Sequence, residues 1–319
     1  MSPRSSLSSL VFTVLIALSL PSYAQFTFAP INVPGAVATE ARGINNNGEI
    51  VGFYKTTACT DYDIKVPACP VKGFKYVNSK FIKLMVPGST STAILGVNDL
   101  GDLVGFYTKS DGSKHGFIWY HQNVVKTIDY PNPPANTSTV AFGINKAGTV
   151  VGGLWVVNPS FGTFPDGGWV WVNGKFSNMD PFNHSAAGPC CWSVNGISNN
   201  GIIAGQLFQA DFNQAWLKEG IDEDFYMDVP SGNSAGDTFG TGLNSATDIV
   251  GYGYRGWFAK NIEQNEGTND STEQQPKFMT VAYPGASITI PFGLNDARAV
   301  VGTYSDSKGM HGFLAKANF

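Results

Sequence analysis

Charged residues are scarce in this sequence, and basic residues do not cluster anywhere along it. Lys and Arg number 20 and Asp and Glu number 24, so that 14% of the chain is charged and the net charge is −4. Proteins that bind nucleic acids or anionic membrane surfaces usually carry a concentrated basic patch. The composition therefore predicts that neither of these is a partner.

Long apolar runs are also absent beyond the first 24 residues. The chain opens with Arg4, an apolar run from Leu10 to Leu20 and the small-x-small tripeptide Ser22-Tyr23-Ala24, which is the pattern of a secretory signal peptide. The run is shorter than the roughly 20 apolar residues that span a bilayer. We expect residues 1–24 to be a signal peptide, and residues 25–319 to be a single domain that is secreted, extracellular or periplasmic, without a membrane span.

Cysteine and histidine are few, with four of each. No CxxC pair occurs and the histidines do not lie at ligand spacing near the cysteines, so a zinc site is not expected. Cys59 and Cys69 flank one insertion, and an oxidising compartment favours a disulfide that closes this loop. Cys190 and Cys191 are adjacent, and the sequence leaves open whether they form a vicinal disulfide or stay as thiols.

Glycine, in contrast, is abundant at 37 residues, and much of it marks a repeat. A segment like Ala41–Tyr54 occurs six times, and in every copy an opening glycine precedes a closing glycine by nine residues. The pairs are Gly43/Gly52, Gly96/Gly105, Gly143/Gly152, Gly196/Gly205, Gly242/Gly251 and Gly293/Gly302. Constant spacing within a copy and variable spacing between copies indicate a fixed hairpin and variable surface loops. We number the copies as units 1–6.

Each unit is expected to hold four short strands. In unit 1, the turn Asn45–Gly48 separates a first strand from the β-branched and aromatic second strand that follows. A third strand carries Gly or Ala before an aromatic residue, and a fourth ends in a proline turn. Four strands in about 50 residues, without helical periodicity, are typical of a propeller blade. The fourth turn position is Gly in four units but Thr247 and Arg298 in the others; a positive φ there would strain Thr247.

The two ends of the chain complement one another. Unit 6 stops at its third strand, His311–Leu314, and its missing fourth strand resembles the segment Phe26–Ala36 at the other end. Pairing the two would remove the exposed sheet edges of an open array. The sequence therefore predicts an all-β, six-bladed β-propeller with four-stranded blades, closed by the N-terminal strand next to His311–Lys316.

Aromatic residues in the insertions suggest where a ligand binds. In a four-stranded blade the loops after the second and fourth strands emerge on one face, and most insertions fall there. Exposed aromatic surfaces suit stacking on sugar rings or apolar ligands; the alternative is that these side chains pack the insertions onto the blades. The candidate binding residues are Tyr62, Trp155, Phe161, Phe164, His184 and Trp192.

The sequence supports candidate catalytic residues less well than candidate binding residues. Gly232–Gly236 matches G-x-S-x-G around Ser234, but that elbow needs a helix after the turn, and none is expected. Ser234 and His184 therefore stand only as alternative catalytic residues. His115 and His311 occupy the same position before Gly-Phe in two units, which indicates that they belong to the repeat.

A recurring polar residue opens every turn. Its side chain could belong to a ring of oxygens around a calcium ion, or it could cap its own turn. We favour capping, because serine ligates calcium poorly, and we expect no cofactor. These residues are Asn45, Asn98, Asn145, Ser198, Asn244 and Asn295.

The repeated Gly-Ile-Asn-x-x-Gly-x-Ile-Val-Gly-x-Tyr, followed by His-Gly-Phe and Pro-Gly-Ala, resembles the bacterial extracellular HAF-repeat family over nearly the whole mature chain. The resemblance implies a secreted, β-propeller-like repeat protein and no catalytic residues. Our leading hypothesis is a non-enzymatic monomer that binds an extracellular carbohydrate or protein through its loop-rich face. The alternatives are a propeller hydrolase or lactonase with a site on the axis, and a structural envelope protein.

Overall fold

The computed structural model describes residues 25–58, 69–158, 162–179, 192–208, 213–219, 223–227, 238–260 and 278–319. Within these ranges the chain forms strands and no helix, and so no helix with the length and apolarity to cross a bilayer. The strands are β1 (Phe26–Ile31), β2 (Ala38–Ile44), β3 (Ile50–Lys55), β4 (Lys72–Val77), β5 (Lys80–Leu84), β6 (Ser91–Val97), β7 (Leu103–Thr108), β8 (Lys114–Trp119), β9 (Val125–Ile128), β10 (Thr137–Ile144), β11 (Val150–Asn158), β12 (Gly162–Val172), β13 (Lys175–Met179), β14 (Trp192–Ile197), β15 (Ile203–Phe208), β16 (Asn213–Glu219), β17 (Glu223–Met227), β18 (Phe239–Leu243), β19 (Ile249–Tyr252), β20 (Gly256–Ala259), β21 (Phe278–Val281), β22 (Ile288–Leu294), β23 (Ala299–Asp306) and β24 (Gly309–Ala317).

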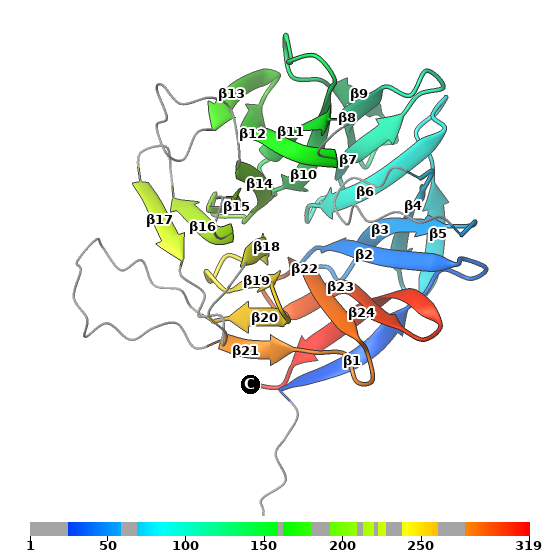
Figure 1. Cartoon of the computed structure of the whole chain (residues 1–319), viewed down its shortest axis with the longest axis vertical. Helices are drawn as coiled ribbons and strands as arrows, with labels where there is room; N and C mark the ends of the chain where they lie inside the picture. The colour runs from blue at the N-terminus through cyan, green and yellow to red at the C-terminus, as the bar shows by residue number, and fades with distance from the viewer. Residues whose placement is uncertain are drawn as a thin grey trace, which may run out of the picture.

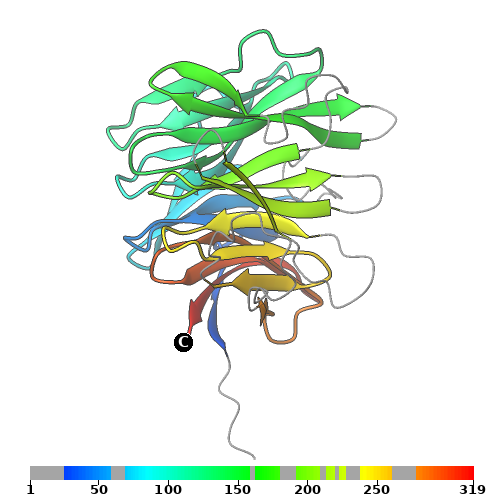
Figure 2. The ribbon, with the colours of Figure 1, turned by 90° about the vertical axis from the view of Figure 1, so that its left-hand side faces the viewer.

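The strands pair in antiparallel groups of four that match the repeat. Units 1 to 5 are β2–β5, β6–β9, β10–β13, β14–β17 and β18–β21, and unit 6 consists of β22, β23, β24 and β1. One parallel bridge, Ala38 to Met310, joins units 6 and 1 into an eight-stranded sheet. The groups are arranged about a common centre, with the first strand of each group innermost (Figure 1), and are stacked side by side when seen from the edge (Figure 2).

The predicted pairing of the two chain ends is confirmed. Strand β1 runs antiparallel to β24, with a register from Phe26 opposite Ala317 to Ile31 opposite Gly312. Phe26 is buried and its ring packs against Phe258 of unit 5 at a centroid distance of 5.9 Å. The N-terminal strand therefore completes the last unit.

Turn capping by the recurring polar residue is also confirmed, and four of the asparagines in addition donate a hydrogen bond to the next unit. Oδ1 of Asn45 accepts a hydrogen bond from the Glu49 main-chain N at 2.9 Å, while its Nδ2 donates to the Asn98 carbonyl of unit 2 at 2.9 Å. The same inter-unit bond runs from Asn295 back to Asn45 at 3.0 Å. We call these six positions the turn layer: Asn45, Asn98, Asn145, Ser198, Asn244 and Asn295.

The fourth turn residue has positive φ in all six units, which is the condition under which the sequence predicts strain at Thr247. Gly48 and Gly201 have φ of 77° and 92°, and Thr247 and Arg298 both have φ of 57°. A β-branched residue is disfavoured in this left-handed region because its Cβ crowds the backbone. The turn geometry is thus imposed on Thr247 by the repeat.

A side chain is excluded at each of the two glycines of the repeat, for a different reason in each case. A Cβ on the closing Gly205 would lie 2.2 Å from Cζ2 of Trp216, because the aromatic ring of the third strand covers the glycine. A Cβ on the opening Gly293 would lie 3.1 Å from the Cα of Gly43, because the innermost strands of neighbouring units approach closely. The buried clusters correspondingly lie between units, as where Val250 of unit 5 packs with Val300 of unit 6.

Candidate functional site

Each innermost strand has a bulge at the same place. The register between first and second strands shifts across the residue before the opening glycine, as between Ala41 and Gly43. The same shift recurs in the other five units. Bulges re-aim side chains and are common beside binding sites. The bulged residues, which we call the bulge layer, are Arg42, Leu95, Phe142, Asn195, Thr241 and Phe292.

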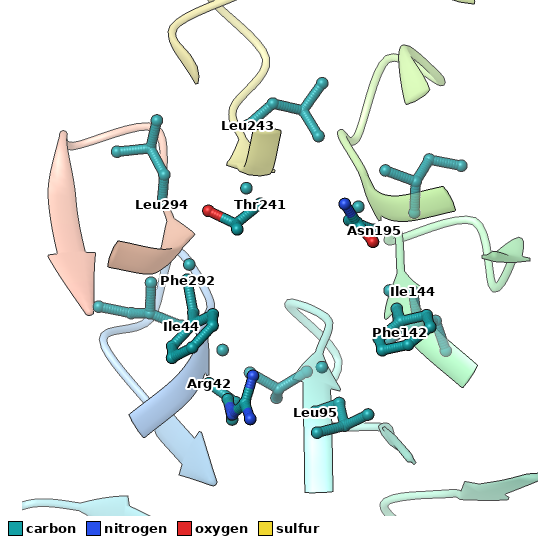
Figure 3. A pocket seen from close by; sticks show the side chains of 18 residues that line it. Arg42, Ile44, Leu95, Phe142, Ile144, Asn195, Thr241, Leu243, Phe292 and Leu294 are labelled. Carbon is teal, nitrogen blue, oxygen red and sulfur yellow. The ribbon is translucent and has the colours of Figure 1, made fainter. Parts of the chain in front are cut away.

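The bulge layer lines a cavity at the centre of the molecule. Its volume is about 100 Å³, and its wall comprises the bulge layer, the six opening glycines and the six residues that follow them. Figure 3 shows side chains of all six inner strands around this space. The glycines leave the wall without side chains at their level, so the bulged residues determine what the cavity presents.

Arg42 is the charged member of the layer, and it is held rigidly. Its Nη2 lies 3.0 Å from Oε2 of Glu40, and both side chains are at least nine-tenths buried. The guanidinium lies 3.9 Å from the ring centroid of Phe292 and 5.0 Å from that of Phe53. Stacking fixes the guanidinium plane, and the carboxylate balances its charge. Arg42 is therefore a positioned donor with little net charge around it.

Units 4 and 5 supply a polar side. Nδ2 of Asn195 donates to the Gly240 carbonyl at 2.6 Å, and its Oδ1 accepts from Oγ of Ser193 at 3.0 Å. Oγ1 of Thr241 donates to the Pro291 carbonyl at 2.8 Å. Behind Asn195, Oε1 of the fully buried Gln206 is 3.3 Å from Nδ2, whereas Nε2 of Gln206 has no hydrogen-bond partner among the described residues.

The facing side is aromatic and aliphatic. Phe142 is half-buried at the cavity wall, and its ring packs edge-on against Trp155 at a centroid distance of 6.0 Å. Trp155 and Leu95 belong to one buried cluster together with Phe53 and Phe106. The cavity thus has a polar arc formed by Asn195 and Thr241 and an apolar arc formed by Leu95 and Phe142, while Arg42 and Phe292 lie next to one another on the remaining side.

Beyond the turn layer, hydrogen bonds cross the channel. Nδ2 of Asn46 donates to Oδ2 of Asp296 at 2.8 Å and to Oδ2 of Asp99 at 3.1 Å. Nδ2 of Asn199 in unit 4 reaches Oδ2 of Asp99 in unit 2 at 2.9 Å. Across the described part of the chain, no group of three or more His, Cys, Asp and Glu side chains could hold a metal ion.

Two predicted binding residues lie in the core, and the expectation that they are exposed is wrong. Trp155 is 4% exposed and supports Phe142, and Trp192 is 8% exposed, with its Nε1 donating to the Met179 carbonyl at 2.8 Å. Both belong to regular strands, β11 and β14, rather than to loops. The alternative that such aromatics pack onto the units is correct for these two.

The other predicted residues lie outside the part of the chain that the structure describes. These are Tyr62, Phe161, His184, Ser234, Cys59, Cys190, Cys191 and the expected signal peptide, residues 1–24. Phe164 lies in β12, and its backbone pairs with that of Val156 in β11. The Phe164 side chain is not among those that the structure describes. Cys69 is not a free thiol, and its pairing with Cys59 remains a prediction.

The described lining offers three polar groups of different kinds. It contains one guanidinium, one carboxamide and one hydroxyl, but no His, Cys, Asp or Glu side chain. The Thr241 hydroxyl bonds the main-chain carbonyls of Val250 and Pro291. The lining can therefore orient a ligand through hydrogen bonds and ring contacts.

Comparison with known proteins shows similarity of fold. No family model matches the chain, and no curated protein matches it. Among solved structures, the Aleuria aurantia lectin in complex with Fucα1-6GlcNAc is 8% identical, with a TM-score of 0.52 over 87% of this chain and 91% of the lectin. Virginiamycin B lyase from Staphylococcus aureus is 9% identical, with a TM-score of 0.47 over 91% and 99% of the two chains. A putative gluconolactonase is 11% identical, with a TM-score of 0.49 over 92% and 93%. The chain therefore has an all-β fold similar to β-propellers.

Proposed function

We propose that the six units are the blades of a closed propeller, and that this propeller is a secreted module whose central cavity binds a small carbohydrate. Closure is supported by the opening glycines, which approach one another from unit to unit and return from Gly293 to Gly43. The Asn295–Asn45 hydrogen bond and the β1–β24 pairing support the same arrangement.

The observation that carries the function is the diversity of the bulge layer. The repeat keeps glycine at the next position in all six units and Asn or Ser two positions further on. The bulged position instead holds Arg, Leu, Phe, Asn, Thr and Phe. Six equivalent positions that face one cavity have thus become unlike, as a single ligand without sixfold symmetry requires.

The chemistry of the wall favours a neutral, polyhydroxylated ring. Glu40 balances the charge of Arg42, so a ligand need not be an anion. A sugar presents hydroxyls on its edges and C–H groups on its faces, which match the polar arc and the apolar arc. The buried Gln206 Nε2 behind Asn195 is typical of sites that complete their hydrogen bonds with bound water or ligand. The similar lectin binds a fucosylated sugar, so fucosides are the first ligands to test.

A glycan array followed by calorimetry with α-methyl-L-fucoside tests this proposal. We expect selective binding to a few glycans, reduced at least about tenfold, equal to 1.4 kcal/mol, by Asn195→Leu and by Phe142→Ala. The control is Asn178→Leu, the same change on an exposed residue of β13. Absence of binding across the array, or full affinity in both cavity variants, would overturn the proposal.

A further inference from the structure

Unit 2 carries a second group of polar side chains, outside the central cavity. Ser113 immediately precedes β8 and His115 lies within it, so the two side chains share one side of the strand because side chains alternate. Strand β9 pairs with β8 up to Gly116 opposite Ile128, which brings the next residue, Asp129, beside His115. The local sheet geometry alone thus brings a serine, a histidine and an aspartate together.

The atoms that face one another are those of an activated serine. Oγ of Ser113 is 2.8 Å from Nε2 of His115, and Nδ1 of His115 is 2.8 Å from Oδ2 of Asp129. In such a chain the carboxylate fixes the tautomer with hydrogen on Nδ1, which leaves the Nε2 lone pair free to accept the serine proton. The order and the distances both meet the geometric requirement for a nucleophile, its base and the group that orients the base.

Surrounding residues hold the imidazole in place and leave it accessible. Tyr107 lies opposite His115 in the β7–β8 pair, and the two rings stack at a centroid distance of 5.3 Å. The Tyr107 hydroxyl is itself fixed by Thr127 Oγ1 at 2.9 Å. The His115 side chain is 19% exposed, that of Asp129 is 46% exposed and Ser113 is half-buried, so the group lies at the surface of the molecule.

Unit 6 provides an internal comparison. It has the same histidine, His311, opposite the same tyrosine, Tyr304. Counting back from the shared His-Gly-Phe, however, it has Gly309 at the position of Ser113, and Asn32 follows β1 at the position of Asp129. The repeat therefore requires neither the serine nor the aspartate, and unit 2 differs from unit 6 at the two positions that complete the chain.

We infer that Ser113, His115 and Asp129 form a hydrolytic site for esters of small acyl groups. The Ser113 Oγ bonds to the ester carbonyl carbon while Nε2 of His115 takes its proton. The carbon–oxygen bond to the alcohol then breaks, and the departing oxygen takes the proton from Nε2. Water repeats the sequence on the acyl-serine, which releases the acid and restores Ser113. The open position of the hairpin favours short acyl groups, which need no enclosed pocket.

Asp111 limits this activity. Its Oδ1 lies 2.7 Å from the Ser113 Oγ and accepts a hydrogen bond from it. One hydroxyl proton cannot serve both acceptors, so molecules in which the proton is directed to Asp111 are not activated. Replacing the carboxylate by a weaker acceptor should shift the proton toward His115 and raise the rate.

The test combines turnover of p-nitrophenyl acetate with covalent labelling by a fluorophosphonate. We expect a fluorophosphonate adduct on the peptide that contains Ser113, and turnover about a hundredfold lower in Ser113→Ala. Asp129→Asn should also slow turnover, Asp111→Asn should accelerate it, and His311→Ala should match the wild type.

Three results would overturn the inference. If Ser113→Ala retained full turnover, a histidine side chain would be hydrolysing the ester without the serine. If no fluorophosphonate adduct formed on Ser113, this residue would be excluded as the nucleophile. Slower turnover in Asp111→Asn would make Asp111 the base instead of His115. Because none of these residues lines the central cavity, failure of the hydrolytic site leaves the glycan-binding proposal untouched, and the reverse also holds.

Discussion

Two neighbouring layers of the central channel, three residues apart on each inner strand, have opposite character. The turn layer is nearly uniform: its asparagines accept the same bond from their own turns, and four of the five also donate to the next unit. The bulge layer is diverse, and each of its side chains has different neighbours. The positions that the repeat keeps constant stabilise the fold. The positions that it varies are available to contact a ligand. The predictions below test this division, beginning with the largest effect.

Gly52→Ala should destabilise the protein most, because the repeat keeps the closing glycine for a steric reason. The new Cβ would lie 1.9 Å from the Glu40 carbonyl oxygen and 2.9 Å from Cε1 of Phe74. We expect a loss of about 3 kcal/mol or more in the free energy of unfolding, measured by urea denaturation. The control is Gly48→Ala, which meets no atom within 4 Å at φ 77° and should cost about 1–2 kcal/mol. Equal losses in the two variants would contradict the steric explanation.

Asn295→Ala should separate stability from binding. It removes the bond to the Asn45 carbonyl at 3.0 Å and the bond from the Ala299 main-chain N at 2.9 Å. We expect the free energy of unfolding to fall by about 2 kcal/mol, with the affinity for any cavity ligand unchanged. Asn47→Ala, which removes an exposed bond to the Asp99 carbonyl, should cost no more than about 0.5 kcal/mol. A loss of affinity without a loss of stability would reverse the roles of the two layers.

Asp102→Asn tests an acid beside the turn layer and should act in a pH-dependent way. Burial raises the pKa of Asp102, but hydrogen bonds from the main chain and side chain of His121 and from Asn98 outweigh it, so that the pKa is lowered overall. A lowered folded-state pKa means that the carboxylate stabilises the fold above its unfolded pKa of 3.8, and that this stabilisation is lost as the pH falls through the folded value.

The variant should therefore unfold more easily than the wild type near neutral pH, by about 1–2 kcal/mol. The difference should shrink at pH values below 3.8. Thermal unfolding of both proteins across this pH range measures it, and a constant difference would exclude the carboxylate as its source.

Thr247→Gly should have the smallest effect and the opposite sign. The φ of 57° strains threonine but not glycine, so we expect a gain of a few tenths to about 1 kcal/mol. Arg298→Gly relieves the same φ but removes the 2.7 Å contact from Arg298 Nε to Asp248 Oδ2, and should gain less. An unchanged or lower melting temperature for Thr247→Gly would mean that the turn carries no such strain.

Much of the fold could be predicted because the same pattern of strands and turns recurs in six units. The Asn-x-x-Gly turns, the positive φ at Thr247 and the pairing of Phe26–Ile31 with the last unit all followed from residue types at fixed spacing. The inter-unit bonds of the asparagines could not be predicted in this way. They depend on how closely neighbouring strands approach, which no single unit specifies.

A site on the axis was among the alternatives, but the residues that line the cavity were not predicted, for a related reason. A repeat is recognised by what its copies share, and Arg42, Asn195 and Phe142 are residues that the copies do not share. The bulge that directs them inward is visible only in the strand register. A usable signal was nonetheless present, since the position before the shared glycine varied in polarity and charge, while the residue before it was apolar or glycine in every copy.

The pairing of β1 with β24 also determines how the molecule responds to a pull on its ends. Phe26 faces Ala317, so both ends of the chain leave the strand pair on the same side. Tension applied there loads one cross-strand pair at a time, as in opening a zipper, instead of shearing all six pairs together. Strand β1 should therefore separate from β24 at a low force, at which the other units of the molecule are still folded.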